Sequence, residues 1–449
     1  MKTGLSNFPC VSTKPEDILV YGYDSSMLEK QPIAVARPTD VGELVELVRA
    51  AYAKNIALIP RGAGTGTVGG SVPVEQSSVV ISFERMNRIL EIDKENMVAV
   101  VEPGVINGVF QRTLKDQGLF YPPDPASLNF STLGGNVATG AGGPRAVKYG
   151  VTRDYVLGLE IVLPDGTVTN TGVRTAKGVV GYDLTRLIVG SEGTLAFVTK
   201  ITLKILPEPE TVVTLVTTFD SISNSAQTVS KIMASGIVPR TLEFMDKNSL
   251  KVVESYKHSG LPTSGAMLLI ELDGPTFVVN REIENISAIC KSFAGEVQIA
   301  RSEAAAEKLW EARRSISPAL YRISTTKINQ DIVVPRSSVP EMLLRLDEIA
   351  EKTGLFIVNF GHAGDGNIHV NIMTDKSDPE KYNHATAAVD DIFRATLELN
   401  GTISGEHGVG LKKKPYIEME LDEVVISLMK HIKRVFDPAG IMNPGKIFP

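Results

Sequence analysis

The alternation of apolar and polar residues predicts short strands and amphipathic helices separated by many glycine-rich turns. Asp40 and Glu43 form a capping-box pattern and open a predicted helix that runs to about Lys54. Together with the strands on either side, this helix predicts a βαβ unit. Strands of the first half are predicted at 33–36, 56–59, 79–82, 98–101, 157–163 and 195–205.

A second series of elements begins after the proline-containing stretch at 207–209. Strands are predicted at 212–219, 266–272, 331–334, 355–360 and 366–373, and helices end near 235, 293, 352 and 400. The repeated order predicts a weak internal duplication and an antiparallel or mixed sheet covered by helices. A last helix is predicted over 422–436.

The strand predicted at 366–373 alternates strictly, with Asn367, His369 and Asn371 on one face and isoleucine or valine on the other. The turn-forming residues 363–366 precede it, so the chain is expected to bend sharply and bring His362 back towards His369. The alternative is an edge strand with a solvated polar face and an ordinary hairpin turn.

A second glycine-rich motif, 404–410, contains Glu406 and His407, so half of the chain's six histidines lie in these two motifs. Two imidazoles and a carboxylate suit zinc, manganese or iron and leave coordination positions open for a substrate. The remaining histidine, His407, is then available for proton transfer near neutral pH or as a fourth metal ligand. The first hypothesis is therefore a metal-assisted enzyme.

Residues 64–69 satisfy the G-x-G-x-x-G pattern after a predicted strand. The context argues against a Rossmann fold, because the motif should open a helix and here a glycine pair and Pro73 follow. Such a loop can still bind phosphates through its backbone amides, with Arg61 as a counter-charge. A plain surface loop is the alternative.

Length and composition indicate two or three domains of ordinary globular character in a chain of 449 residues. The net charge of -6 argues against a nucleic-acid partner.

The two cysteines of the chain, Cys10 and Cys290, are too few to ligate an iron–sulfur cluster, so any cluster must belong to another subunit. The sequence has neither an apolar run typical of a signal peptide nor a predicted transmembrane segment, so we expect a cytoplasmic protein, with docking onto a membrane complex left open.

Further glycine-rich blocks at 122–127, 131–143 and 190–195 follow in order. With them the chain resembles, over nearly its full length, the vanillyl-alcohol oxidase family of flavoenzymes, in the branch of the glycolate oxidase D subunit, D-lactate dehydrogenase and D-2-hydroxyglutarate dehydrogenase. The resemblance implies an α+β fold of two lobes. A PCMH-type FAD-binding domain would span 1–207, and a cap with a mostly antiparallel sheet and the metal site would span 208–420. A C-terminal segment, 421–449, would return to the first domain.

The resemblance also implies residue roles. His362, His369 and Glu406 would bind the metal, with His407 as the catalytic base. Substrate contacts would come from Arg313, Ser317, Lys327 and Asn371, although Arg313 also suits a surface ion pair and Lys327 a solvated lysine. The implied FAD contacts are Arg61, Gly62, Ala63, Gly64, Thr65, Pro125, Ser127, Gly134, Gly135, Asn136, Thr139, Gly142, Gly143, Glu192, Gly193, Leu195 and Asn443.

The expected activity is oxidation of a 2-hydroxy acid of the lactate, glycolate or 2-hydroxyglutarate class to its 2-oxo acid, with hydride transfer to FAD. Electrons would pass to a protein acceptor or a quinone. For the oligomeric state, a homodimer and a subunit of a larger complex are both left open.

FAD should be non-covalent, because no histidine precedes His258 and Cys10 lies away from the flavin loops. The alternatives are a non-redox enzyme of the alkyl-ether-lipid synthase type, which Glu406 disfavours, and an FAD-binding subunit of an electron-transfer complex.

Overall fold

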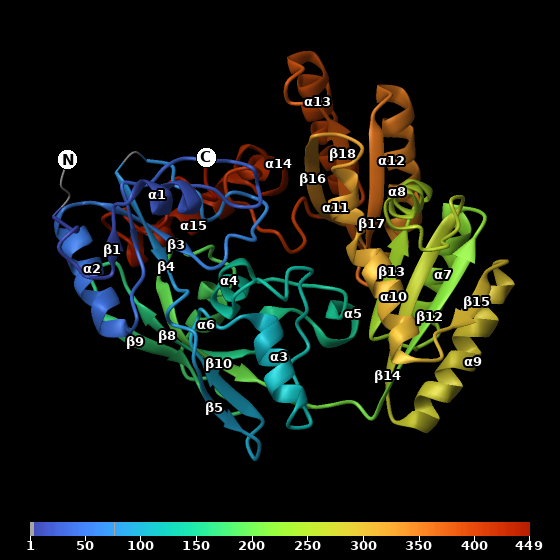
Figure 1. Cartoon of the computed structure of the whole chain (residues 1–449), viewed down its shortest axis with the longest axis horizontal. Coiled ribbons are helices and arrows are strands. Elements are labelled where there is room, and N and C mark those ends of the chain that lie inside the picture. The colour runs from blue at the N-terminus through green and yellow to red at the C-terminus, as the bar shows by residue number, and fades with distance from the viewer. Residues whose placement is uncertain (1–3, 76) are drawn as a thin grey trace. The chain divides into compact units, whose positions relative to one another are not determined.

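The computed structural model describes residues 4–75 and 77–449 (Figure 1). The chain forms two compact units. Unit 1 comprises Met1–Gly142, Gly150–Glu208 and Glu406–Pro449, and unit 2 comprises Gly143–Tyr149 and Pro209–Gly405.

The first boundary between the units follows Glu208, next to the boundary predicted at 207/208, and two other segments are divided differently. The chain returns to unit 1 at Glu406 rather than at 421, and Gly143–Tyr149 joins unit 2. Within unit 2 this short segment is bound to Asp273, which accepts hydrogen bonds from Lys148 and from the Tyr149 hydroxyl (2.8 Å). Such long-range bonds leave no signal in the local sequence pattern.

Unit 1 contains two main sheets and a small two-stranded one. Its strands are β1 (Val11–Ser12), β2 (Ala34–Ala36), β3 (Ala57–Arg61), β4 (Ser78–Ser82), β5 (Ile89–Asp93), β6 (Val98–Val101), β7 (Leu119–Phe120), β8 (Val156–Val162), β9 (Val168–Gly172), β10 (Phe197–Lys204) and β11 (Leu206–Pro207). Its helices are α1 (Pro15–Tyr21), α2 (Val41–Ala53), α3 (Asn107–Lys115), α4 (Leu133–Thr139), α6 (Leu184–Ile188), α14 (Ile417–Glu420) and α15 (Glu423–Phe436), with 3-10 turns η1 (Thr152–Asp154) and η3 (Lys414–Tyr416).

The first sheet has the order β1-β2-β4-β3, in which β2 and β3 both run parallel to β4. The second sheet, β5-β6-β10-β8-β9, is antiparallel, as is the pair β7 and β11. The predicted βαβ unit is therefore present, although β4 lies between its two strands.

Helix α2 shows why this part of the chain folds as predicted. The Asp40 side chain accepts a hydrogen bond from the backbone N–H of Glu43 (3.0 Å), as in a capping box. The Glu43 carboxylate in turn accepts from the N–H of Thr39 (2.8 Å), one residue before the expected position. The helix buries the residues spaced three and four apart, Leu44, Leu47, Val48 and Ala51, against the first sheet.

The loop after β3 is not a Rossmann turn, in agreement with the prediction. No helix follows the G-x-G-x-x-G pattern within the described residues 62–75. Gly64 and Gly69 have positive φ angles, +70° and +80°, which L side chains rarely adopt. The glycines therefore shape a loop instead of opening a helix.

Unit 2 consists of one seven-stranded sheet and its covering helices. Its strands are β12 (Thr211–Phe219), β13 (Thr241–Met245), β14 (Ala266–Gly274), β15 (Glu296–Ile299), β16 (Thr326–Val333), β17 (Phe356–His362) and β18 (Asn367–Thr374). Its helices are α5 (Ala146–Tyr149), α7 (Ile222–Ala234), α8 (Lys247–Lys257), α9 (Thr276–Ser292), α10 (Glu303–Arg314), α11 (Ile316–Leu320), α12 (Val339–Thr353) and α13 (Pro379–Glu398), with the 3-10 turn η2 (Arg336–Ser338).

The strand order is β15-β12-β14-β13-β17-β18-β16, and every neighbouring pair is antiparallel. The mostly antiparallel sheet predicted for the cap is thus confirmed. Helices α7, α9, α12 and α13 cover one face of the sheet, and α8, α10 and α11 pack on the other through an apolar cluster that includes Met245, Leu269 and Phe360 (Figure 1).

Strand β18 is internal, with β17 and β16 as its neighbours, and all eight of its residues are buried. This excludes the edge strand with a solvated polar face. The predicted sharp bend is confirmed, since β17 and β18 form a hairpin in which His362 pairs with Asn367. Strand β16 begins at Thr326 rather than 331, because its polar residues Lys327 and Asn329 face the same side as the histidines and interrupt the apolar pattern.

Within the described part of the chain, no helix has both the length and the apolar character needed to cross a bilayer.

Candidate active site

A large cavity of unit 1 lies among the glycine-rich loops. The empty space of about 1460 Å³ at this place includes open solvent at the mouth of the cavity. It is lined by these residues of the predicted FAD set: Arg61, Gly62, Ala63, Gly64, Thr65, Pro125, Ser127, Gly134, Gly135, Asn136, Thr139, Gly142, Glu192 and Gly193. Sequence reasoning missed other lining residues: Thr132 and Ser191 lie inside the predicted glycine-rich blocks, whereas Pro103 follows β6 and lies outside them.

Three residues of the predicted set do not line the cavity. Gly143 belongs to unit 2, and Leu195 is buried in the core of unit 1. Asn443 stands behind the wall, where its Nδ2 donates to the carbonyl oxygens of Gly70 (2.9 Å) and Glu192 (2.7 Å). Its contribution is to hold two cavity loops together.

The walls fit a flavin nucleotide. A methyl group at Gly62 would lie 2.4 Å from Thr132 Oγ1, and one at Gly134 would lie 2.5 Å from the Cβ of Pro103. These positions must therefore remain bare backbone, which a ligand can approach closely. The buried Nδ2 of Asn136 has no hydrogen-bond partner within residues 4–75 and 77–449, so it is a donor available to a ligand. Arg61 adds a positive charge beside the loop.

Glu192 has a positioning role that its motif did not reveal. Its carboxylate accepts hydrogen bonds from the backbone N–H groups of Val409 (2.7 Å) and Gly410 (2.8 Å). Burial raises its pKa, and these two hydrogen bonds oppose the rise. The carboxylate thereby fixes the backbone just after Glu406 and His407, both of which line the same cavity as the flavin loops.

In unit 2, two buried imidazoles face each other across the β17–β18 hairpin. The Nε2 atoms of His362 and His369 are 3.4 Å apart. The Nδ1 of His362 lies 2.6 Å from a carboxylate oxygen of Glu243, and the Nδ1 of His369 lies 3.6 Å from one of Asp331. Metal-binding histidines typically have one nitrogen held by a carboxylate in this way while the other faces the ion.

Glu243 is fully buried beside two donors, His362 and Arg313. Burial raises the pKa of its carboxyl, yet the interactions with His362 and Arg313 outweigh that effect and bring the pKa below its ordinary value. A buried carboxylate with a guanidinium and an imidazole beside it is favoured in its charged form.

Asp331 connects this pair of imidazoles to the second histidine motif. One of its oxygens accepts from the Nδ2 of Asn367 (2.6 Å) and the other from the backbone N–H of Gly405 (3.0 Å). Because Glu406 and His407 follow Gly405 directly, the chain carries their side chains to the same place.

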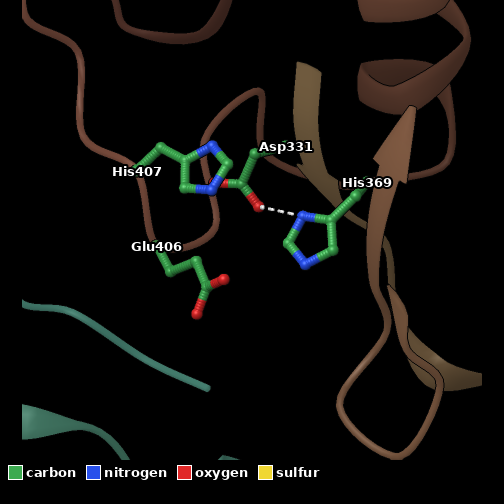
Figure 2. Close-up of side chains that lie close together, drawn as sticks. All are labelled: Asp331, His369, Glu406 and His407. Carbon is green, nitrogen blue, oxygen red and sulfur yellow. Dashed lines mark ion pairs between the residues drawn. The ribbon is translucent and has the colours of Figure 1, made fainter. Parts of the chain in front are cut away.

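Figure 2 shows Asp331, His369, Glu406 and His407 turned towards one another, with ligand atoms that all lie within 4.8 Å of one another. This group contains two of the three predicted ligands, His369 and Glu406. It adds Asp331, which sequence reasoning missed, and the predicted base His407. His362 is not in this group, although its Nε2 faces that of His369.

Arg313 is not a surface residue, which excludes the surface ion pair considered for it. The residue is only 8% exposed, and its guanidinium lies 4.5 Å above the Phe360 ring and contacts a Glu243 oxygen at 2.6 Å. Its Nε is buried and has no hydrogen-bond partner among the described residues. The residue can therefore donate to an anionic ligand.

The other predicted substrate residues are also half-buried or buried. The Nζ of Lys327 donates to the Oγ of Ser317 (2.6 Å), so the structure brings these two together. Asn371 is fully buried, its Nδ2 donates to backbone carbonyls of β17 and β18, and its Oδ1 accepts from Asn329 (2.8 Å). The amide of Asn371 is thus engaged within the sheet.

Comparison with protein families accounts for both units. Residues 32–172 match the FAD binding domain, and residues 208–447, more than half of the chain, match the C-terminal domain of FAD linked oxidases. The chain belongs to the FAD-linked oxidase family.

Relatives of this FAD-linked oxidase cover almost the whole chain. It is 48% identical to a glycolate oxidase subunit GlcD of Bacillus subtilis, over 96% of this chain and 92% of the relative. It is 34% identical to a D-lactate dehydrogenase of Anaerostipes hadrus (96% and 91%) and 33% identical to a D-2-hydroxyglutarate dehydrogenase of Stutzerimonas stutzeri (98% and 96%). The resemblance inferred from the motifs is therefore confirmed.

Solved structures share the fold. Substrate-bound p-cresol methylhydroxylase superposes with a TM-score of 0.82 at 18% identity, covering 98% of this chain and 93% of that chain. An alkyldihydroxyacetonephosphate synthase gives 0.76 at 20% identity, covering 97% and 82%. At these identities the likeness shows the fold alone.

We expect Gly134→Ala to lower the FAD content of this FAD-linked oxidase. The new methyl group would lie 2.5 Å from the Cβ and 2.9 Å from the carbonyl oxygen of Pro103, so α4 would have to shift within the cavity wall. The measurement is the ratio of bound flavin to protein in the visible absorption spectrum.

Gly118→Ala is the control, because Gly118 has a φ of +71° but no atom within 4 Å of the added methyl group. It should cost about 1 kcal/mol of stability through backbone strain and leave the flavin content unchanged. Equal flavin loss in both variants would show that Gly134 has no special part in the wall.

Proposed function

We propose that this enzyme is an FAD- and divalent-metal-dependent dehydrogenase that oxidises a small 2-hydroxy acid to its 2-oxo acid. The observation that carries the proposal is the convergence of the Nε2 atoms of His362 and His369, each imidazole backed by a buried carboxylate. A second support is that Glu406 and His407 line the same cavity as the flavin loops.

His362, His369 and Glu406 are the proposed metal ligands. Two nitrogens and one carboxylate match the preferences of zinc, manganese or iron. A bound divalent cation supplies Lewis acidity, which lowers the pKa of a coordinated hydroxyl. In this assignment Asp331 orients His369 from behind, because its oxygens already accept hydrogen bonds from Asn367 and Gly405.

The remaining polar residues divide the work on the substrate. His407 takes the proton of the C2 hydroxyl, and the buried guanidinium of Arg313 binds a carboxylate. Lys327, held by Ser317, adds a second cation on the same face of the sheet, and Asn371 keeps β17 and β18 in place beside the imidazoles. FAD, when bound, supplies the acceptor for the two electrons.

The class of substrate follows from what three relatives have in common. Their names refer to glycolate, D-lactate and D-2-hydroxyglutarate, which share a hydroxyl next to a carboxylate and differ in the group on C2. Electrons would then pass to a separate protein or a quinone, because the two cysteines, both buried, are too few to hold an iron–sulfur cluster.

Metal removal tests the proposal. Purified protein should reduce an artificial electron-accepting dye with at least one of glycolate, D-lactate or D-2-hydroxyglutarate. Chelation should abolish this turnover, and zinc, manganese or iron should restore it. No turnover with any 2-hydroxy acid after metal reconstitution would exclude the proposed function.

The ligand assignment is tested alongside. His369→Ala should lose both metal and activity while it retains FAD, since His369 belongs to unit 2 and the FAD cavity to unit 1. His384→Ala is the matched control, because His384 is exposed on α13 and bonds only the Thr353 carbonyl among the contacts described. Full metal content in His369→Ala by elemental analysis would contradict the assignment.

His407→Ala should keep metal and flavin but lower kcat by about 10²- to 10⁴-fold, the usual contribution of a general base. Metal content and kcat are to be measured on one preparation, with His431→Ala, an exposed histidine of α15, as the control. A fall in metal content together with kcat would instead identify His407 as a fourth ligand.

Acid precipitation should release the flavin into the supernatant. Residues 1–208 contain no histidine, and Cys10 is buried and absent from the cavity lining. The expectation from the sequence is corrected at one point, because the cavity lining does include one histidine, His407. Flavin that stays with the pellet in the wild type but not in His407→Ala would reveal a covalent bond at that residue.

A further inference from the structure

Glu243 lies at the centre of the polar face of unit 2. It belongs to β13, where it is directly opposite His362 of β17 in the register of the sheet. Its side chain is completely buried. Neither histidine motif includes it, and more than a hundred residues separate it from His362 in the sequence.

The two oxygens of this carboxylate hold two different groups. Oε1 lies 2.6 Å from the Nδ1 of His362, and Oε2 lies 2.6 Å from an Nη of Arg313. Each partner has a second polar atom directed elsewhere. The Nε2 of His362 faces the Nε2 of His369, and the Nε of Arg313 is buried without a hydrogen-bond partner in the part of the chain that the structure describes.

The neighbouring buried carboxylates of the sheet do not share this arrangement. Glu271 of β14 accepts from the indole N–H of Trp310 (2.6 Å) and from Thr214 (3.1 Å), and Asp273 binds Arg240 and Tyr149. Those groups tie α10 and the Gly143–Tyr149 segment to the sheet. Glu243 alone among the three contacts an imidazole of the hairpin.

We propose that Glu243 is a positioning residue that holds the metal-side imidazole of His362 and the carboxylate-binding guanidinium of Arg313 at one fixed separation. The inference rests on the proposed function for its meaning in catalysis. A substrate whose hydroxyl and carboxylate are bound at the two ends must match that separation. A single rigid carboxylate sets it more exactly than two independent contacts would, because neither partner can move without breaking a charge-assisted hydrogen bond.

The experiment compares Glu243→Gln with Glu271→Gln, an equally conservative change at the adjacent strand that does not reach the imidazoles. In Glu243→Gln we expect a 10- to 100-fold loss of zinc affinity, measured by competition with a chelator dye without substrate. KM for the 2-hydroxy acid should rise as well, while FAD content and the melting temperature remain close to those of Glu271→Gln. Zinc affinity in Glu271→Gln should equal that of the wild type.

A double-mutant cycle tests the link itself. If one carboxylate positions both groups, adding Arg313→Lys to Glu243→Gln should raise KM by less than Arg313→Lys does in the wild-type background. Additive effects would show that the two contacts are independent and would overturn the proposal, as would wild-type zinc affinity in a folded Glu243→Gln.

Should Glu243→Gln fail to fold, Glu243→Asp keeps the charge but is too short to reach both partners, and the same losses are expected there. Wild-type zinc affinity and KM in Glu243→Asp would contradict the proposal. The zinc measurement needs no turnover, so it decides the role of Glu243 at His362 even if no 2-hydroxy acid is oxidised and the proposed function falls.

Discussion

The cost of burying charged and polar groups is the constraint on which the candidate site depends. An unpaired carboxylate or imidazole inside a protein is costly, so each must meet a partner when the sheet forms. The antiparallel register of unit 2 supplies these partners. It places Glu243 opposite His362, Asp331 opposite His369 and Asn329 opposite Asn371. A shift of one residue in β13 would turn Glu243 to the other face, and the same shift in β16 would turn Asp331 and Asn329 away from their partners.

Unit 1 meets the same constraint with backbone groups. Its cavity wall is built largely from glycines, and close approach of the backbone at Gly62 and Gly134 leaves no room for side chains. The buried carboxylate of Glu192 is satisfied by two backbone N–H groups instead of by a cation. A cavity of this kind presents mainly backbone groups to a ligand, with a few charged side chains such as Arg61 and Glu406 among them.

The sequence predicts the parts of the site that rest on local patterns. Strict alternation at 366–373 and the turn before it were enough to place His369 near His362, and the glycine blocks were enough to outline the cavity. Glu243, Asp331 and the anchoring role of Glu192 could not be predicted, because each depends on pairing between segments far apart in the chain. The early start of β16 was hidden for a related reason, since Lys327 and Asn329 serve the polar face and weaken the apolar signal.

Asp331 and Glu192 explain how a loop can carry the proposed metal ligand Glu406 and the proposed base His407 with the precision of a strand. Loops tolerate motion, whereas a catalytic constellation requires side chains fixed by their surroundings. Glu406 and His407 lie on irregular backbone, yet the residue before them, Gly405, is bound to Asp331. The residues after them, Val409 and Gly410, are bound to Glu192. Buried carboxylates thus hold both ends of a short segment and leave the two side chains between them to meet the ligand.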